Sequence, residues 1–182
     1  MSMLTMSGAA RAIERLNPSE ANRAVGESWL SLWSGGKPPT GERFIKSCHS
    51  SLVPALAVFE IHERGPIKCV LAGAFYQLAL GFNLTGQDIL LIAPAADREI
   101  RLERMWSVAN GAVMSANRNF ALLGGGSVSV EEIYLPLFAR PDAAARFYLH
   151  HSNWRPVGHE WMAGTVKTNL NLAQNPSAIS IN

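Results

Sequence analysis

The stretch that decides the fold is CVLAGAFYQLALGFNLTG, from Cys69 to Gly86. Its apolar beginning predicts a buried strand, and Gly73 then permits an abrupt change of backbone direction into about one helical turn. Gly81 follows, and we expect this glycine and Gly86 at positive-φ or close-contact positions that a side chain would obstruct. The rest of the chain is therefore expected to complete a small α/β cup around this segment.

Length and charge limit the classes of protein to consider. The 182 residues, 19.8 kDa, predict one domain with extensions and a sizeable core. Only 16% of the residues are charged, against about 25% in an ordinary domain, and the net charge is +2. This balance argues against nucleic-acid binding, which needs clustered Lys and Arg. It also leaves apolar surface that favours self-association.

Cysteine usage and apolar runs predict a cytoplasmic protein. The two cysteines, Cys48 and Cys69, give no disulfide framework. The first residues mix Arg11 and Glu14 with small side chains, unlike a secretory signal. The longest apolar run, from Cys69 to Phe82, is shorter than the roughly 20 residues of a membrane span. We therefore expect no membrane span.

The N-terminal part predicts helices. The sequence Asn17-Pro18-Ser19-Glu20 is typical of a helix start, with Asn17 as the cap. The helix that follows is expected to end at Gly35-Gly36 and to present one apolar face. That face has two possible partners, the domain's own sheet or a second copy of the chain. The candidate dimer interface comprises Val25, Trp29, Leu32 and Trp33.

The central part predicts a hairpin and a long helix. Residues 55–63 and 67–71 alternate as strands around a turn at Gly65-Pro66. Asp97 can cap a long helix over 98–118, whose apolar stripe follows i, i+3, i+4 spacing and should pack on a sheet. The opposite, solvated side of that helix is expected to carry Arg98, Arg101 and Arg104.

Three further strands are predicted, over 120–124, 130–139 and 145–154. The resulting order predicts an α+β fold with a five-stranded antiparallel sheet and helices segregated on one face. The chain would then divide into an N-terminal helical extension (1–50), a central domain (51–156) and an extended or disordered tail (157–182).

Several motifs, taken in order, carry a family resemblance. They are Leu71-Ala72-Gly73, Gly81 and Leu84-Thr85-Gly86; Glu132-Ile133-Tyr134-Leu135-Pro136-Leu137; Trp29-Leu30-x-Leu32; and Gly35-Gly36-Lys37-Pro38-Pro39. Over positions 20–156 the chain resembles the stand-alone PAS-domain proteins common in alphaproteobacteria. It departs from them at Val70, where the family usually has Arg, and at Ala74, where it usually has Thr.

The resemblance implies a PAS fold and a role in bacterial signal transduction through contacts with histidine kinases or other signalling proteins. The chain would act as a sensory or protein-interaction module without its own output domain, and not as an enzyme. A ligand or partner would bias the packing of the helix over 98–118 against the sheet.

A small-molecule pocket is expected between that helix and the sheet. Its candidate residues are Tyr76, Met105, Trp106, Ala109 and Val113, with His150 or His151 as a polar contact. The same side chains could simply form a core. The alternative hypothesis is therefore a structural dimerisation or scaffold module with a filled core and no ligand.

The identity of any ligand or cofactor stays open. No histidine forms a metal-binding spacing with either cysteine. Haem-binding PAS domains present a histidine near the long helix, and residues 98–118 contain none; flavin-binding ones carry a reactive cysteine in an Asn-Cys-Arg-Phe-like run, which is missing. The sequence thus argues against haem and flavin. Ser127 and Ser129 lack a nucleophile elbow, which argues against catalysis.

Overall fold

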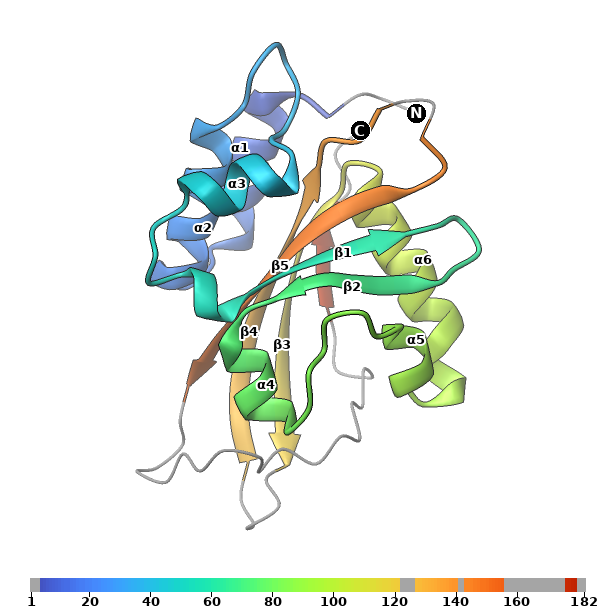
Figure 1. Cartoon of the computed structure of the whole chain (residues 1–182). Helices are drawn as coiled ribbons and strands as arrows, with labels where there is room; N and C mark the ends of the chain where they lie inside the picture. The colour runs from blue at the N-terminus through green and yellow to red at the C-terminus, as the bar shows by residue number, and fades with distance from the viewer. Residues whose placement is uncertain (1–3, 122–126, 141–142, 156–175, 180–182) are drawn as a thin grey trace.

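A computed structural model describes residues 4–121, 127–140, 143–155 and 176–179 of the chain. At its centre is an antiparallel sheet with the strand order β2-β1-β5-β4-β3-β6 (Figure 1). The strands are β1 (Leu56–Ile61), β2 (Ile67–Ala72), β3 (Val113–Ala121), β4 (Ser127–Leu137), β5 (Arg146–Arg155) and β6 (Pro176–Ile179). The predicted α+β fold with a five-stranded antiparallel sheet is confirmed, and β6 adds a sixth strand beside β3.

Helices cover both faces of the sheet (Figure 1). One face packs against α1 (Met6–Leu16), α2 (Glu20–Ser31) and α3 (Gly41–Ser47), and the other against α4 (Ala74–Leu80), α5 (Ile89–Ile92) and α6 (Arg98–Ala109). Two short 3-10 turns, η1 (Val53–Ala55) and η2 (Ala95–Asp97), complete the helical elements. The helices of the central domain, α4, α5 and α6, lie on one face of the sheet as predicted, and the N-terminal helices α1, α2 and α3 cover the opposite face.

The N-terminal helices are anchored to the sheet by hydrogen bonds as well as by apolar packing. The indole Nε1 of Trp29 donates to the carbonyl of Pro136 on β4 at 2.9 Å. The backbone N–H of Ser19, the N-cap of α2, donates to Glu131 Oε1 at 2.8 Å. Asn17 does not cap α2 as predicted, because it ends α1 in a left-handed conformation with φ 43°.

The predicted long helix over 98–118 is wrong in its second half. α6 ends at Ala109, and Gly111, with φ 114°, begins the turn into β3. The small residues before Ala116 fit the spacing of a helical stripe as well as that of a strand. In the structure they enter β3, where alternate side chains face the same side of the sheet. Because these residues belong to a strand, Val113 faces α1 and Met114 faces α6.

The segment from Cys69 to Gly86 forms the predicted strand, bend and helical turn. Gly73 has an ordinary φ of −67°, so a glycine is needed there because a Cβ would collide with the carbonyl oxygens of Val53 and Pro54. Gly81 and Gly86 have positive φ, as predicted. The loop returns along β2, where the N–H of Gly86 donates to the carbonyl of Cys69 at 2.7 Å.

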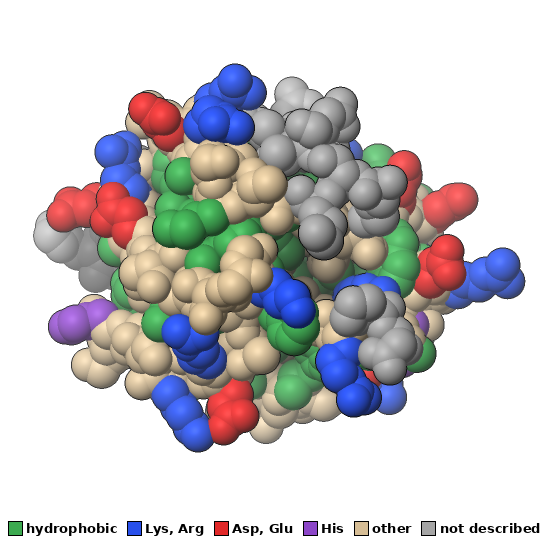
Figure 2. All heavy atoms as spheres, turned by 90° about the horizontal axis from the view of Figure 1, so that it is seen from above, with side chains coloured by type: hydrophobic (Ala, Val, Ile, Leu, Met, Phe, Trp, Pro, Cys, Tyr) green, Lys and Arg blue, Asp and Glu red, His purple; other side chains and the backbone are tan. Residues whose placement is uncertain are grey.

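Charged side chains of both signs are dispersed around the outline of the molecule seen from above, with apolar side chains between them (Figure 2). Within the described ranges, no helix combines the length and apolar character needed to cross a bilayer. Of the expected extended tail, residues 176–179 form β6, and the remainder lies outside the described residues.

Candidate ligand-binding site

A cavity of about 90 Å³ lies between α6 and the sheet. The loop after α4 and the short helix α5 close its sides. Most of its wall is apolar, and charged, hydroxyl and imidazole groups enter it from α6 and from three strands. The lining residues are Phe59, Tyr76, Leu80, Phe82, Leu84, Ile89, Ile92, Arg101, Arg104, Met105, Met114, Arg118, Phe120, Glu132, Tyr134, Tyr148, His150, Ser152 and Trp154.

Strand alternation explains which side chains reach this cavity. On β3, β4 and β5 the lining residues all have even numbers, since successive side chains of a strand point to opposite faces. The register places Tyr134 opposite both Met114 and His150, and Glu132 opposite Ser152. Three neighbouring strands therefore deliver their polar groups to one patch of the cavity wall.

Glu132 is the negative centre of that patch. Its Oε2 accepts hydrogen bonds from Arg118 Nε and, at 2.7 Å, from the Tyr134 hydroxyl. Arg118 Nη2 also donates to the Tyr134 oxygen at 3.1 Å. Burial alone would raise the pKa of Glu132, but the charge of Arg118, with His150 and Tyr134, outweighs burial and lowers the pKa to about 2. The Glu132 carboxyl is therefore ionised inside the fold.

His150 extends the polar network toward α4. Its Nδ1 lies 3.1 Å from the Tyr76 hydroxyl and its Nε2 lies 3.4 Å from Glu132 Oε1. Tyr76 donates to the carbonyl of Ala55 at 3.1 Å, and burial raises the pKa of its hydroxyl well above the usual value. The imidazole also stacks on Tyr134, with ring centroids 4.5 Å apart. His150 is thus held in one orientation from several sides.

Arg101 brings a further positive charge from α6. Its side chain lines the cavity and the residue is only 9% exposed, so it does not lie on a solvated helix face as expected. Its Nε and Nη2 atoms are buried without a hydrogen-bond partner among the described residues. Burial lowers the pKa of Arg101, and the nearby charge of Arg118 adds to this effect.

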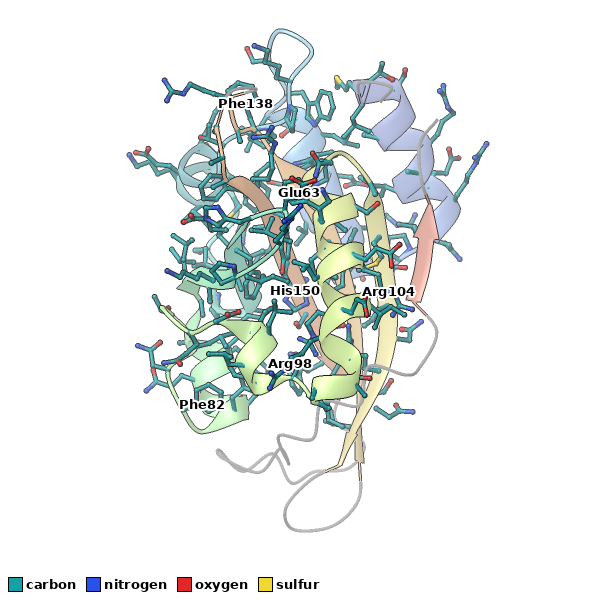
Figure 3. The ribbon with its side chains drawn as sticks, turned by 90° about the vertical axis from the view of Figure 1, so that its right-hand side faces the viewer. Glu63, Phe82, Arg98, Arg104, Phe138 and His150 are labelled. Carbon is teal, nitrogen blue, oxygen red and sulfur yellow. The ribbon has the colours of Figure 1, made fainter. Side chains whose placement is uncertain are left out.

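The other two arginines of α6 occupy different environments (Figure 3). Arg98, at the first turn, is exposed, as the sequence predicted. Arg104 is half-buried on the side of α6 nearer β3 and lines the cavity, which corrects its predicted place on a solvated face. The helix therefore carries one buried, one half-buried and one exposed arginine.

The predicted pocket residues separate into three groups. Tyr76, Met105 and His150 line the cavity. Trp106 and Ala109 belong to the same apolar cluster without lining it. Val113 and His151 lie on the opposite face of the sheet, so their assignment to the pocket is wrong.

His151 has a structural setting on that face. Its Nδ1 donates to Asn22 Oδ1 at 2.7 Å, because an amide oxygen can only accept, and Asn22 Nδ2 donates to the carbonyl of Glu131 at 3.2 Å. Burial, with a smaller effect of His150, lowers the pKa of His151 to about 4. The imidazole therefore fixes α2 to β5 in its neutral form.

The four candidate dimer residues fall into two groups by burial. Val25 and Trp29 are fully buried against their own sheet, which is one of the two packing partners considered for α2. Leu32 and Trp33 are half-buried at the end of that helix. Trp33 packs edge-on against Trp29, with ring centroids 5.2 Å apart.

Among the described residues, no group of three or more His, Cys, Asp or Glu side chains could hold a metal ion. The cavity wall offers charged groups, hydrogen-bonding groups and an apolar surface, which are the features of small-molecule sites. Sequence reasoning missed its central residues, Arg101, Arg118 and Glu132. The local sequence offers little signal for them. Arg118 lies between Asn117 and Asn119, and Glu132 follows Glu131, so only Tyr134 has apolar neighbours on both sides.

Comparisons with solved structures find PAS and LOV domains. A PAS domain of an HTR-like protein from Haloarcula marismortui has 17% identity and a TM-score of 0.38, with 58% of this chain and 87% of that chain covered. A PAS domain from Colwellia psychrerythraea has 14% identity and a TM-score of 0.38, with 57% and 91% covered. A fungal LOV domain photoreceptor has 17% identity and a TM-score of 0.36, with 55% and 73% covered. No family model and no curated protein matches the chain.

Proposed function

We propose that this protein is a bacterial sensory module of the PAS type that binds a small molecule between α6 and the sheet. The observation that carries the proposal is a cavity with ionised groups in its wall, at the centre of an otherwise apolar cluster. Burying charges costs free energy that a purely structural core avoids with apolar side chains. A scaffold with a filled core accounts less well for this arrangement.

The signal would leave through protein contact. Arg101, Arg104 and Met105 all extend from α6 into the cavity wall, so a bound ligand would change the relative stability of different packings of α6. Exposed apolar side chains on the elements around the cavity supply contact area for a histidine kinase or another signalling protein. These are Val70 on β2, Leu78 on α4, Leu91 on α5 and Ile100 on α6.

A homodimer is also part of the proposal. Of the residues expected at its interface, Leu32 and Trp33 keep exposed area, so they would make the contact. Changing both residues to serine should convert a dimer to a monomer in size-exclusion chromatography with light scattering. An unchanged dimer would place the interface elsewhere.

We further propose that the module is cytoplasmic and acts by binding, not by catalysis. Burial raises the pKa of the Cys69 thiol to about 12, which is unsuited to a nucleophile at neutral pH. The Arg118 and Glu132 groups of the cavity wall already bind each other, which suits recognition of a ligand better than proton transfer.

The test is a screen of neutral organic fragments by ligand-observed NMR on three proteins. In Leu80→Phe a larger ring enters the cavity wall, whereas Leu78→Phe makes the same change at a 52% exposed position of the same helix. We expect to find fragments that bind the wild type and Leu78→Phe but do not bind Leu80→Phe. A screen without such fragments, together with no binding of small anions that depends on the cavity residues, would contradict the proposed ligand site.

A further inference from the structure

We propose that the ligand is a small organic monoanion whose carboxylate is held by Arg101 beside Arg118. This inference rests on the proposed function of the cavity as a ligand site. It concerns the chemistry of the ligand and assigns Arg101 as the residue that recognises it.

The first observation is the unsatisfied guanidinium group of Arg101. A guanidinium carries five N–H donors and stays charged, and two of the nitrogens of Arg101 are buried without a partner in the described part of the chain. No ion pair joins Arg101 to Asp97, one helical turn earlier, or to any other carboxylate among the described residues. A buried charge without a partner is strongly unfavourable, so an anion in the cavity would restore the missing contacts.

The second observation is the charge balance of the cavity wall. The buried Arg101 and the largely enclosed Arg118, whose side chain is 11% exposed, bring two positive charges, and Glu132 supplies one negative charge that is already bound to Arg118. Burial raises the pKa of the three lining tyrosines, Tyr76, Tyr134 and Tyr148, so they stay neutral. Among Arg101, Arg118 and Glu132 one positive charge is left over, and a singly charged anion balances it. Arg104, half-buried at the cavity wall, adds attraction without being enclosed.

The third observation is the size and polarity of the remaining space. The cavity of about 90 Å³ is smaller than the roughly 150 Å³ that accommodates benzene in an engineered protein cavity. Much of its wall is apolar, with Leu84, Ile89, Met105 and Phe120 among the lining residues. A carboxylate with a short aliphatic body fits both features. Its two oxygens match the fork of an arginine better than a single-point acceptor does.

The experiment measures the melting temperature with isobutyrate and with isobutyramide, its neutral counterpart of similar shape. The proteins are the wild type, Arg101→Met, and Arg98→Met as the exposed control on the same helix. We expect isobutyrate to raise the melting temperature of the wild type and of Arg98→Met, and isobutyramide to have a much smaller effect. In Arg101→Met the affinity for isobutyrate should fall at least about tenfold, the loss expected for hydrogen bonds to a charged group.

Two results would overturn the inference. One is equal protection of the wild type and Arg101→Met by isobutyrate. The other is no protection of the wild type by any of acetate, propionate, isobutyrate and isovalerate. Should Arg101→Met fail to fold, Arg101→Lys provides the second test, since it keeps the charge but loses the fork; equal affinity in Arg101→Lys and the wild type would also overturn the inference.

The failure of this inference and that of the proposed function can be told apart. If neutral fragments bind in a manner that depends on Leu80 while carboxylates do not, the cavity is a ligand site and the ligand is not an anion. If no fragment depends on Leu80 and no carboxylate depends on Arg101, both proposals fail.

Discussion

The two faces of the sheet are covered in similar ways but packed differently. On the face under α1, α2 and α3, large apolar side chains such as Trp29, Phe44 and Leu149 are fully buried against one another. On the face under α4, α5 and α6, the largely enclosed ion pair of Arg118 and Glu132 lies beside a cavity. One face therefore contributes mainly to stability, and the other keeps space and charge in the interior.

Adjacent histidines on β5 show the difference within a single dipeptide. His151 faces α2 and makes a fixed hydrogen bond to Asn22. His150 faces the cavity and contacts Tyr76, Glu132 and the ring of Tyr134. The alternation of a strand thus places one histidine in a structural setting and its neighbour in the candidate ligand site.

The largest expected effect is the loss of Trp29. Trp29→Ala should lower the free energy of unfolding by about 4 kcal/mol, because it leaves a large void and removes the hydrogen bond to Pro136. Urea denaturation measures this loss. Trp106→Ala on α6 is the comparison, since Trp106 is only half-buried and should cost clearly less. An equal loss in the two variants would contradict the difference between the faces.

Breaking the buried ion pair should have the next largest effect. Glu132→Gln leaves Arg118 without its charged partner and should lower the free energy of unfolding by about 3 kcal/mol. The double variant Glu132→Gln/Arg118→Met should recover much of this loss, because it removes both charges. Glu42→Gln, in the exposed pair with Lys46, should cause no measurable change and serves as the control. A Glu132→Gln protein as stable as the wild type would refute the role of the pair.

The two faces should also respond to acid over different pH ranges. The pKa of His151 is lower when folded, so the unfolded chain binds the proton more tightly, and stability is lost as pH falls from about 6.5 to about 4. The loss should reach about 3 kcal/mol by pH 4, and His151→Gln should abolish it. The depressed pKa of Glu132 stabilises the fold fully above about pH 4.5, and this contribution is lost as pH falls toward 2. Urea denaturation at a series of pH values measures both effects. An unchanged slope above pH 4 in His151→Gln would contradict the assignment.

The smallest effects come from added volume. Val25→Leu adds a methylene to the filled face and should cost about 1 kcal/mol. Ile92→Phe adds volume at the cavity wall and should leave the stability almost unchanged, since the ring has space to enter. Thermal denaturation of the two variants compares them directly. A larger loss in Ile92→Phe would indicate that the cavity cannot accept added groups.

Local sequence signals predicted the hairpin, the bend at Gly73 and three of the pocket residues. Prediction failed at the junction of α6 and β3, because small residues such as Ala112 and Ala116 satisfy a helical and an alternating pattern together. Arg101 looked like a solvated helix position, since its burial depends on how α6 lies on the sheet. The partnership of Arg118 with Glu132 depends on the register of β3 and β4, which no local pattern contains.

The most direct measurement is the NMR spectrum of the protein labelled with ¹³C in its methionine methyl groups, recorded under xenon pressure. Xenon is uncharged and binds in apolar cavities, so it tests for open space along the apolar part of the wall independently of the proposed anion. Met105 and Met114 line the cavity, whereas Met6 on α1 is 50% exposed on the other side of the sheet. We expect the methyl signals of Met105 and Met114 to shift with xenon pressure while that of Met6 stays in place. Unchanged signals for Met105 and Met114 would show that this face is filled like the other, and would contradict the ligand site.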